Sequence, residues 1–296
     1  MLVLVGTTPT PGLLLTQGRV TYNGVLRIGD SLEIPGAPPM HCTTAMMASA
    51  AVVCQTFGYE APYGITAGCI GDGSGSKLLY KYLTEEVEKL DADVFTLHHI
   101  VPQTKLIKQV MDAIRAWKKR PILIGGAGGM YAVKAAGLAP LFDLFTPDSG
   151  ELAFLSDADA LHPASVRHFV SNVDQTDMPR LIAHAYEHGD AAKILLVKGE
   201  TDYVVCQGEI LATIAEPNIA AMESIGGTGD TITGIASALI YVGMEIVQAC
   251  KQTALINRVA GLLCHPTPAT QIGEFIAQIP RALEQVLQKQ GGVAYA

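Results

Sequence analysis

The segment Gly226-Gly227-Thr228-Gly229-Asp230 leads directly into an apolar stretch that runs to Val242. Glycines allow backbone N–H groups to approach an anion closely, and the N-terminus of a helix adds the positive end of its dipole. An aspartate at the mouth of an anion site is electrostatically out of place unless it handles a proton. A phosphate-binding loop followed by a carboxylate base is typical of phosphoryl transfer to a hydroxyl.

The composition of the chain favours a soluble α/β protein. Hydrophobic residues make up 49% of the 296 residues and charged residues 16%, which fits a sheet covered on both faces. The net charge of −8, without a basic stripe, argues against a nucleic-acid partner. The first residues, MLVLVG, predict a strand and not a signal peptide, and the apolar stretches fall short of a membrane span. We therefore expect a cytoplasmic protein with no membrane partner.

Cysteines and histidines show no metal-binding pattern along the chain. The cysteines, which are scattered without a CxxC spacing, are Cys42, Cys54, Cys69, Cys206, Cys250 and Cys264. Several lie in apolar runs, which favours buried free thiols over disulfides or a zinc site. His41, His98 and His99 fall at the ends of expected elements near the possible substrate side, and we expect them to be ordinary polar residues.

Short apolar runs alternate with longer segments of helical pattern, which is typical of βαβ units. The expected strands are residues 2–5, 63–66, 94–98, 122–124, 141–145, 194–197 and 203–206. The expected helices are residues 43–57, 75–90, 103–118, 129–137, 149–156, 164–171, 178–188, 231–243, 245–264 and 271–289. Right-handed crossovers would make residues 1–296 one α/β domain, a three-layer αβα sandwich around a mostly parallel sheet.

One region departs from this rhythm. Asn23-Gly24 lies between two alternating segments within residues 20–28, which predicts a hairpin with a type I′ turn. A proline-rich connector, residues 34–40, follows it. We expect residues 18–40 to form a small flap or a dimer contact, and an edge hairpin without a functional role is an equal alternative.

Two further segments could carry chemistry. Thr146-Pro147-Asp148-Ser149-Gly150-Glu151 follows an expected strand and begins a helix, with Asp148 or Ser149 as its cap. Glu151, in the first turn of this helix, would either interact favourably with the positive end of the helix dipole or hold a water molecule bound to Mg²⁺. Lys198-Gly199 ends another strand and so lies at the carboxyl edge of the sheet, where ligand clefts of α/β proteins open.

These segments, in this order, resemble the motifs of the ribokinase-like superfamily, and the resemblance is strongest over residues 140–285. Within it, the carboxy half is most similar to ADP- or ATP-dependent NAD(P)H-hydrate dehydratases, which carry a Thr-Pro block ending in Gly-Glu and the run Gly-Gly-Thr-Gly-Asp. The amino half resembles PfkB-type sugar kinases through Pro35-Gly36, the helix 42–54 and the turn Gly71-Asp72. Residues 125–129 are rich in glycine, and we expect a tight strand-to-helix turn there.

The resemblance implies a role for each motif. Asp230 would be the catalytic base, and the Gly227-Thr228-Gly229 backbone would form the anion hole. Lys198-Gly199 would lie close to the nucleotide, Glu151 would serve the metal, and Gly71 and Asp72 would lie on the substrate side. Asn257 and Arg258 could face the adenine, although we favour packing. The implied cofactors are ATP or ADP and Mg²⁺.

Three functions remain open at this point. A kinase would release a phosphorylated small molecule, whereas a dehydratase would use phosphorylation to make a hydroxyl leave. A catalytically weak nucleotide-binding module is the third, and Asp230 and Glu151 argue against it because a binder needs neither a base nor a metal anchor. Homo-oligomers are common in the resembling families.

Overall fold

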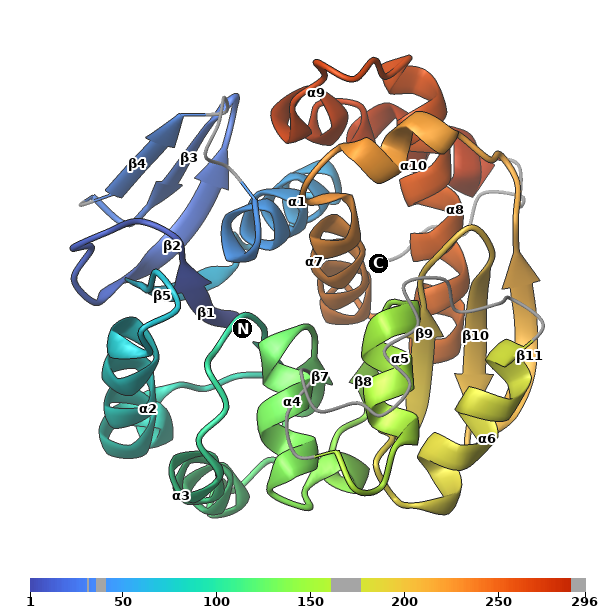
Figure 1. Ribbon diagram of the computed structural model, residues 1–296. Coiled ribbons are helices and arrows are strands. Elements are labelled where there is room, and N and C mark those ends of the chain that lie inside the picture. Colours follow the sequence, from blue (N-terminus) through green and yellow to red (C-terminus); the bar gives the residue numbers. More distant parts are fainter. Residues whose placement is uncertain (31, 36–40, 161–176, 289–296) are drawn as a thin grey trace.

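A single sheet runs through the computed structural model, which describes residues 1–30, 32–35, 41–160 and 177–288 (Figure 1). The sheet has 11 strands in the order β11-β10-β9-β8-β7-β6-β1-β5-β2-β3-β4. Its central strands run parallel to one another: β1 (Leu2–Thr8), β5 (Tyr63–Gly68), β6 (Val94–Leu97), β7 (Ile122–Gly125), β8 (Leu144–Phe145) and β9 (Ile194–Val197). Because parallel strands share a direction, their carboxyl ends meet at one edge of the sheet.

Antiparallel strands extend the sheet on both sides. They are β10 (Asp202–Cys206) and β11 (Glu209–Ile214) on one side, and β2 (Thr16–Tyr22), β3 (Val25–Ile28) and β4 (Leu32–Pro35) on the other. The predicted hairpin is confirmed, but its turn is not of type I′: Gly24 has φ 88°, whereas Asn23 does not have the positive φ that this turn requires at both central residues. Residues 31 and 36–40 of the expected flap lie outside the described residues, and its role stays a prediction.

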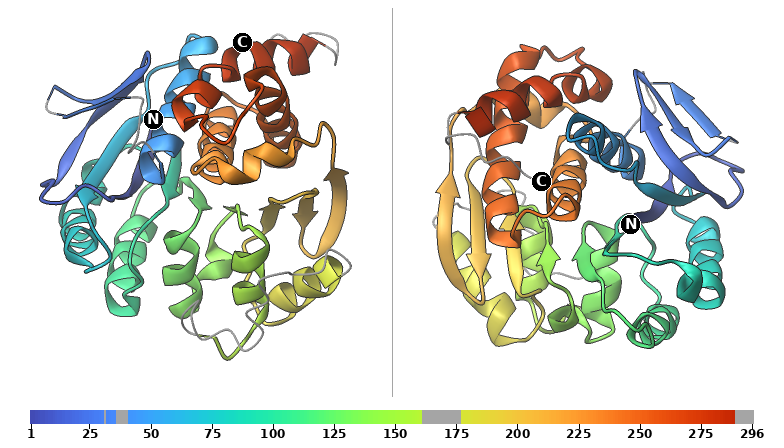
Figure 2. Two further views of the ribbon diagram at one scale, coloured as in Figure 1. Left: turned by 45° about the horizontal axis from the view of Figure 1, so that its top comes forward. Right: turned by 180° about the vertical axis from the view of Figure 1, so that it is seen from behind.

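Helices cover both faces of the sheet, so the expected three-layer αβα architecture is confirmed (Figure 2). One face carries α1 (Thr43–Thr56), α7 (Thr228–Tyr241), α8 (Ile246–Cys264), α9 (Ile272–Ile276) and α10 (Ile279–Gln288). The other face carries α2 (Ser74–Glu86), α3 (Thr104–Arg115), α4 (Gly128–Ala135), α5 (Ser149–Ser156) and α6 (Met178–Glu187). Within β1, Leu2 and Leu4 pack on the first layer and Val3 and Val5 on the second, as the alternation of a strand requires.

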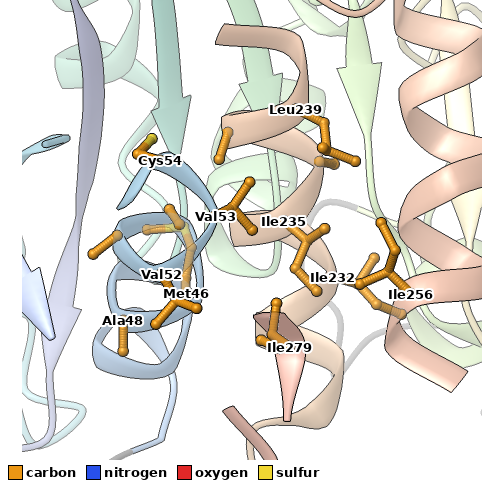
Figure 3. Packing of buried hydrophobic residues seen from close by; sticks show 14 of the residues in the cluster. Met46, Ala48, Val52, Val53, Cys54, Ile232, Ile235, Leu239, Ile256 and Ile279 are labelled. Carbon is orange, nitrogen blue, oxygen red and sulfur yellow. The ribbon is translucent and has the colours of Figure 1, made fainter. Parts of the chain in front are cut away.

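The helices α1 and α7 pack closely in the middle of the first layer (Figure 3). Almost every residue of α1 is buried, and the side chains of Met46 and Val53 face Ile235 of α7. A Cβ atom at Gly234 would lie 2.2 Å from the carbonyl oxygen of Met46, so only glycine permits this approach. The pairing brings the N-terminus of α1 beside the N-terminus of α7.

The structure corrects several expected boundaries. The helix expected over 231–243 begins at Thr228, and the strand expected over 141–145 is reduced to Leu144–Phe145 by a preceding 3₁₀ turn, Ala139–Leu141. The single helix expected over 271–289 is wrong: α9 ends at Ile276 and α10 starts at Ile279, with Pro280 in its first turn, where proline is tolerated. The strands β4 and β11 were not predicted.

The helix expected over 164–171 lies outside the described residues. Among the helices of the described part, none has the length and apolarity that crossing a membrane would require.

Candidate functional site

The carboxyl edge of the parallel strands gathers the side chains that the sequence placed far apart. His98 and His99 follow β6, Asp148 follows β8, and Lys198 follows β9. The N-terminus of α7 points to the same edge, and buried hydrogen bonds of 2.8 Å hold this helix to the sheet. These bonds join Thr96 to Ser237 and Thr146 to Thr233. The helix that carries Asp230 is therefore fixed on two strands.

The first turn of α7 has the form of an anion site. Gly227, its N-cap, has φ 107°, a conformation that glycine adopts without strain. Gly229 lies against Lys198, because a Cβ at this glycine would be 3.3 Å from the lysine Cε. The Thr228 hydroxyl donates to the Ile225 carbonyl at 3.2 Å, which fixes the turn. Free helix N–H groups and an ammonium therefore face the same space.

Asp230 lies in this first turn, between groups from two other elements. Its Oδ1 atom is 3.1 Å from Nε2 of His99 and 3.5 Å from Nε2 of His98. Its Oδ2 atom accepts a hydrogen bond of 2.9 Å from the backbone N–H of Cys42, the residue before α1. Cys42 has φ 58°, an uncommon value for a residue with a side chain, and this conformation aims its N–H at the carboxylate.

The charges of this cluster follow from its contacts. Burial would raise the pKa of Asp230, but the hydrogen bond from His99, the charge of His99 and the charge of Lys198 lower it to about 2. Burial would lower the pKa of His99, but Asp230 and Cys42 raise it to about 10. Burial and the neighbouring His99 hold the pKa of His98 well below its ordinary value. Asp230 and His99 thus form an ion pair beside a neutral His98.

Sequence reasoning missed His98 and His99, which it treated as ordinary polar residues. The signal was their position at the carboxyl end of an expected strand, where ligand sites of α/β proteins lie. The glycines of the turn after β7 support this placement. A Cβ at Gly126 would lie 2.6 Å from Cδ2 of His98, and one at Gly129 would lie 2.4 Å from the Leu97 carbonyl oxygen. The predicted strand-to-helix turn is confirmed, and its glycines make room for the histidines.

Glu151 and Lys198 form a buried ion pair beside this cluster. The lysine Nζ lies 3.4 Å from Oε2 of Glu151, which also accepts a hydrogen bond of 2.8 Å from the Asp148 N–H. Asp148 in turn accepts from the Glu151 N–H, so the two residues form a capping box for α5. Burial raises the pKa of Glu151 although Lys198 opposes it. Burial alone would lower the pKa of Lys198. The carboxylates of Glu151, Asp148 and Asp230 raise it above its ordinary value.

A cavity of about 350 Å³ opens next to Lys198 and the start of α7. Apolar side chains line one part of it, namely Ile219, Met222 and Ile232. The residues that line the rest are Asp148, Lys198, Gly199, Glu200, Asp202, Pro217, Asn218, Ala220, Glu223, Thr228, Gly229, Asn257 and Arg258. The lining of the cavity thus combines apolar side chains with a cation and a helix N-terminus.

Arg258 and Asn257 are buried, but both also line this cavity, so packing and contact with a nucleotide both stay predictions for them. The Arg258 guanidinium donates to Oδ2 of Asp202 at 2.7 Å and to the carbonyl oxygens of Gly199, Glu200 and Ala215 at 2.7–2.9 Å. Asn257 Oδ1 accepts from the Thr231 hydroxyl at 2.7 Å. The buried arginine therefore ties the turn after β9 to the chain that follows β11.

The loop with Gly71 and Asp72 follows β5 and is exposed. Oδ1 of Asp72 accepts hydrogen bonds from the N–H and hydroxyl of Ser74, which lower the pKa of this aspartate. The thiol of Cys69 lies 3.7 Å from the same oxygen. Asp72 therefore holds Ser74, the first residue of α2, and makes no hydrogen bond to Asp230. A role on the substrate side stays a prediction.

The site fits a nucleotide. The apolar part of the cavity suits a base, and the ammonium of Lys198 and the N-terminus of α7 suit phosphates. Asp148 lines the cavity and offers a carboxylate to a hard cation such as Mg²⁺. Glu151 is less available, since Oε2 contacts Lys198 and Asp148, and Oε1 accepts from the Tyr131 hydroxyl at 3.3 Å.

Several known proteins are similar to this chain. A family model described as NAD(P)H-hydrate dehydratase matches residues 25–278. An uncharacterized protein of Methanocaldococcus jannaschii is 44% identical over 224 residues, which cover 76% of this chain and 92% of that protein. The bifunctional NAD(P)H-hydrate repair enzyme Nnr of Pyrobaculum aerophilum is 24% identical over 285 residues, covering 89% of this chain and 51% of the enzyme. This chain therefore spans about half the length of that enzyme.

Solved structures share the fold. The ADP/ATP-dependent NAD(P)H-hydrate dehydratase of Bacillus subtilis, co-crystallized with ATP and Mg²⁺, is 13% identical with a TM-score of 0.56, over 96% of this chain and 88% of that chain. Phosphofructokinase-2 of Escherichia coli with fructose-6-phosphate is 14% identical with a TM-score of 0.53, over 96% of this chain and 100% of that chain.

Proposed function

This chain belongs to the NAD(P)H-hydrate dehydratase family and has the ribokinase-like fold, and from that premise we propose that it transfers a phosphoryl group from ATP or ADP to a hydroxyl of a small molecule. The observation that carries the proposal is the position of Asp230. The carboxylate lies in the first turn of α7, one residue after Gly229, which lines a cavity of about 350 Å³ beside Lys198. A base therefore lies next to a site suited to phosphates.

In the proposed reaction, the acceptor hydroxyl attacks the terminal phosphorus and its proton passes to Asp230. The shortened nucleotide leaves with the electrons of the broken P–O bond. A pKa of about 2 keeps Asp230 ionised, and a weak base is sufficient because phosphoryl transfer has a loose transition state in which positioning and charge stabilisation dominate. The N–H groups at the start of α7 and the Lys198 ammonium stabilise the charge on the transferring oxygens.

The metal requirement follows from the charge of the nucleotide. A Mg²⁺ ion bound with the phosphates supplies neutralisation of their charge, and Asp148 and Glu151 are the carboxylates that would hold its water ligands. Lys198 already neutralises Glu151 at 3.4 Å, so Asp148 is the better placed of the two.

The acceptor that family membership favours is the hydrate of NADH or NADPH. Phosphorylation of the ring hydroxyl turns it into a good leaving group, and loss of phosphate with a ring proton restores the reduced nicotinamide. The balance is one hydrate and one ATP converted into the reduced dinucleotide, ADP, phosphate and a proton.

A PfkB-type sugar kinase is the second candidate, and one structural observation favours it. The strands β2, β3 and β4 form an antiparallel extension beside β5, next to the loop of Gly71 and Asp72. Such an extension could cover an acceptor at the carboxyl edge, and phosphofructokinase-2 shares the fold.

The test compares acceptors with one nucleotide at a time. The purified chain is incubated with Mg-ATP or Mg-ADP and, separately, hydrated NADH, hydrated NADPH or a panel of sugars. Return of the reduced-nicotinamide absorbance supports the dehydratase, and nucleotide consumption on a sugar alone supports the kinase. If no nucleotide is consumed with any of these acceptors, at any concentration of the chain, the result counts against both functions.

Asp230→Asn separates catalysis from binding. We expect turnover to fall on the order of 10²-fold or more, because a general base is lost while the nucleotide site remains. Asp112→Asn is the matched control, since this aspartate on α3 has a side chain that is 73% exposed. Full turnover in Asp230→Asn would show that the base is misassigned.

A further inference from the structure

We infer that Cys42, His99 and Asp230 form a binding site for a thiophilic divalent cation, of which Zn²⁺ is the best match. One ligand atom of each residue lies within 4.8 Å of the other two. The residues precede α1, follow β6 and begin α7, so the fold brings together donors that have no metal-binding spacing in the sequence. The sequence alone therefore argues against a zinc site.

The geometry needs little rearrangement. Zinc bonds of about 2.0 Å to nitrogen or oxygen and about 2.3 Å to sulfur imply donor separations of roughly 3.3–3.6 Å in a tetrahedron. Nε2 of His99 and Oδ1 of Asp230 are already 3.1 Å apart. The Cys42 backbone is held to Oδ2 of Asp230 at 2.9 Å, and its thiol sulfur lies within 4.8 Å of the other two donor atoms.

The donor set decides which cation fits. A thiolate, an imidazole and a carboxylate suit Zn²⁺, whereas Mg²⁺ takes oxygen ligands in an octahedron. Three protein ligands leave the fourth tetrahedral position open to water or to the acceptor, as in zinc sites that are not purely structural. On binding, the Cys42 thiol loses its proton and His99 coordinates as the neutral ring.

Other donors surround the three ligands. Nδ1 of His41 lies 3.0 Å from Sγ of Cys42. His98 is fully buried, its Nε2 lies 3.5 Å from Oδ1 of Asp230, and neither of its ring nitrogens has a hydrogen-bond partner among the described residues. Buried polar groups normally have partners, so an unpartnered imidazole that faces the Asp230 carboxylate points to a ligand at this position.

Occupancy has a consequence for the reaction, and this part rests on the proposed function. A cation on Oδ1 of Asp230 uses the electron pair that would accept the hydroxyl proton. Zinc would therefore inhibit phosphoryl transfer in competition with the acceptor, whereas binding of the cation itself requires no turnover.

The direct test uses Co²⁺ as a spectroscopic probe on the full chain after removal of metals with a chelator. A thiolate ligand gives a charge-transfer band in the near ultraviolet, and tetrahedral coordination gives intense visible bands. We expect both bands at a single equivalent of Co²⁺ and their displacement by Zn²⁺. Cys42→Ser should abolish the charge-transfer band, and Cys264→Ser, which removes a thiol at the end of α8, should retain it.

Calorimetric titration with Zn²⁺ gives the affinity. Loss of a ligand in Cys42→Ser or His99→Gln should raise the dissociation constant on the order of 10²-fold or more. His184→Gln is the matched control, because His184 and His188 lie one turn apart on α6 with ring centroids 6.1 Å apart and form the rival zinc pair. Circular dichroism of each metal-free variant checks its fold, and His99→Gln replaces Cys42→Ser if the latter does not fold.

Several results would overturn the assignment. They are the lack of a charge-transfer band at saturating Co²⁺, a band that survives Cys42→Ser, and zinc binding that is lost in His184→Gln instead. Because none of these measurements involves a nucleotide or an acceptor, failure of the proposed reaction would leave the cation site standing, and failure of the site would leave the reaction standing.

Discussion

Replacement of His99 by glutamine tests whether this histidine is a cation that stabilises the folded chain. The His99–Asp230 pair is partly buried, with 35% of the histidine side chain and 16% of the aspartate side chain exposed. The pKa of Asp230 falls from its ordinary 3.8 to about 2, which corresponds to about 2.5 kcal/mol in favour of the carboxylate. Lys198 supplies part of this energy, and solvent screens His99, so we expect the variant to lose about 1–2 kcal/mol of unfolding free energy.

The pH dependence separates charge from packing. The pKa of His99 is raised from 6.5 to about 10, so its contribution is complete below pH 6.5 and is lost as the pH rises through 10. The pKa of Asp230 is lowered from 3.8, so its contribution is present above that pH and is lost as the pH falls towards 2. The difference between the two proteins should therefore be largest from about pH 4 to 6.5 and shrink towards pH 10.

Urea unfolding at about pH 5.5, about pH 7.5 and about pH 9.5 measures this difference. Both proteins retain His98, Lys198 and the Cys42 thiol, so only the charge on residue 99 and its effect on these neighbours differ. His184→Gln, on α6, should show no such trend. A difference that is the same at all three pH values would mean that the pKa of His99 does not change on folding, and the ion pair would be wrong.

Three further substitutions test the walls of the site. Gly227→Ala should lower the unfolding free energy by about 1–2 kcal/mol, because φ at this residue is 107° and the new Cβ would lie 2.9 Å from a side chain of α9. Gly226→Ala is the control, since its Cβ would meet no atom within 4 Å. Equal thermal midpoints of the two variants would contradict this prediction. Arg258→Met should lower the unfolding free energy, measured with urea, by about 3–5 kcal/mol, because it leaves the buried Asp202 carboxylate unpaired. Adding Asp202→Asn should recover part of this loss. A loss below about 1 kcal/mol in Arg258→Met would refute the prediction. Lys198→Met should weaken ATP binding, measured by calorimetry, by roughly 10- to 100-fold, because a charge-assisted hydrogen bond to phosphate is lost. An unchanged dissociation constant would show that the lysine does not bind the nucleotide.

The sequence predicted the parallel core of the sheet because its strands are buried on both faces and read as continuous apolar runs. The strand β11 was missed because EILATI is mostly exposed and lies at the edge, where the apolar signal is weak. The strand β4 was missed because Pro35 and the prolines that follow suggested a connector. The start of α7 was placed three residues late, since glycines at 227 and 229 conceal a helix that the sheet stabilises through Thr233.

The candidate site was predictable only in part. Local sequence signals mark three of its residues. A glycine loop precedes Asp230, a strand end precedes Lys198, and a helix cap precedes Glu151. The neighbours of Asp230 carry none, because the contacts of the carboxylate with His99 and with Cys42 span 131 and 188 residues. Such pairs are set by strand order and by the packing of α1 on α7, which a pattern along the chain does not record.

That 188-residue separation also determines when the molecule can first assemble its site during synthesis. At translation rates of 5–20 residues per second, α7 leaves the ribosome about 10–40 s after α1. In that interval the apolar surface of α1 lacks the helix that covers it, and binding by a chaperone or cleavage by a protease becomes feasible. Nascent chains arrested before Thr228 should therefore be cut within Thr43–Thr56, and chains arrested after α8 should be resistant; equal cleavage of both would refute this order of assembly.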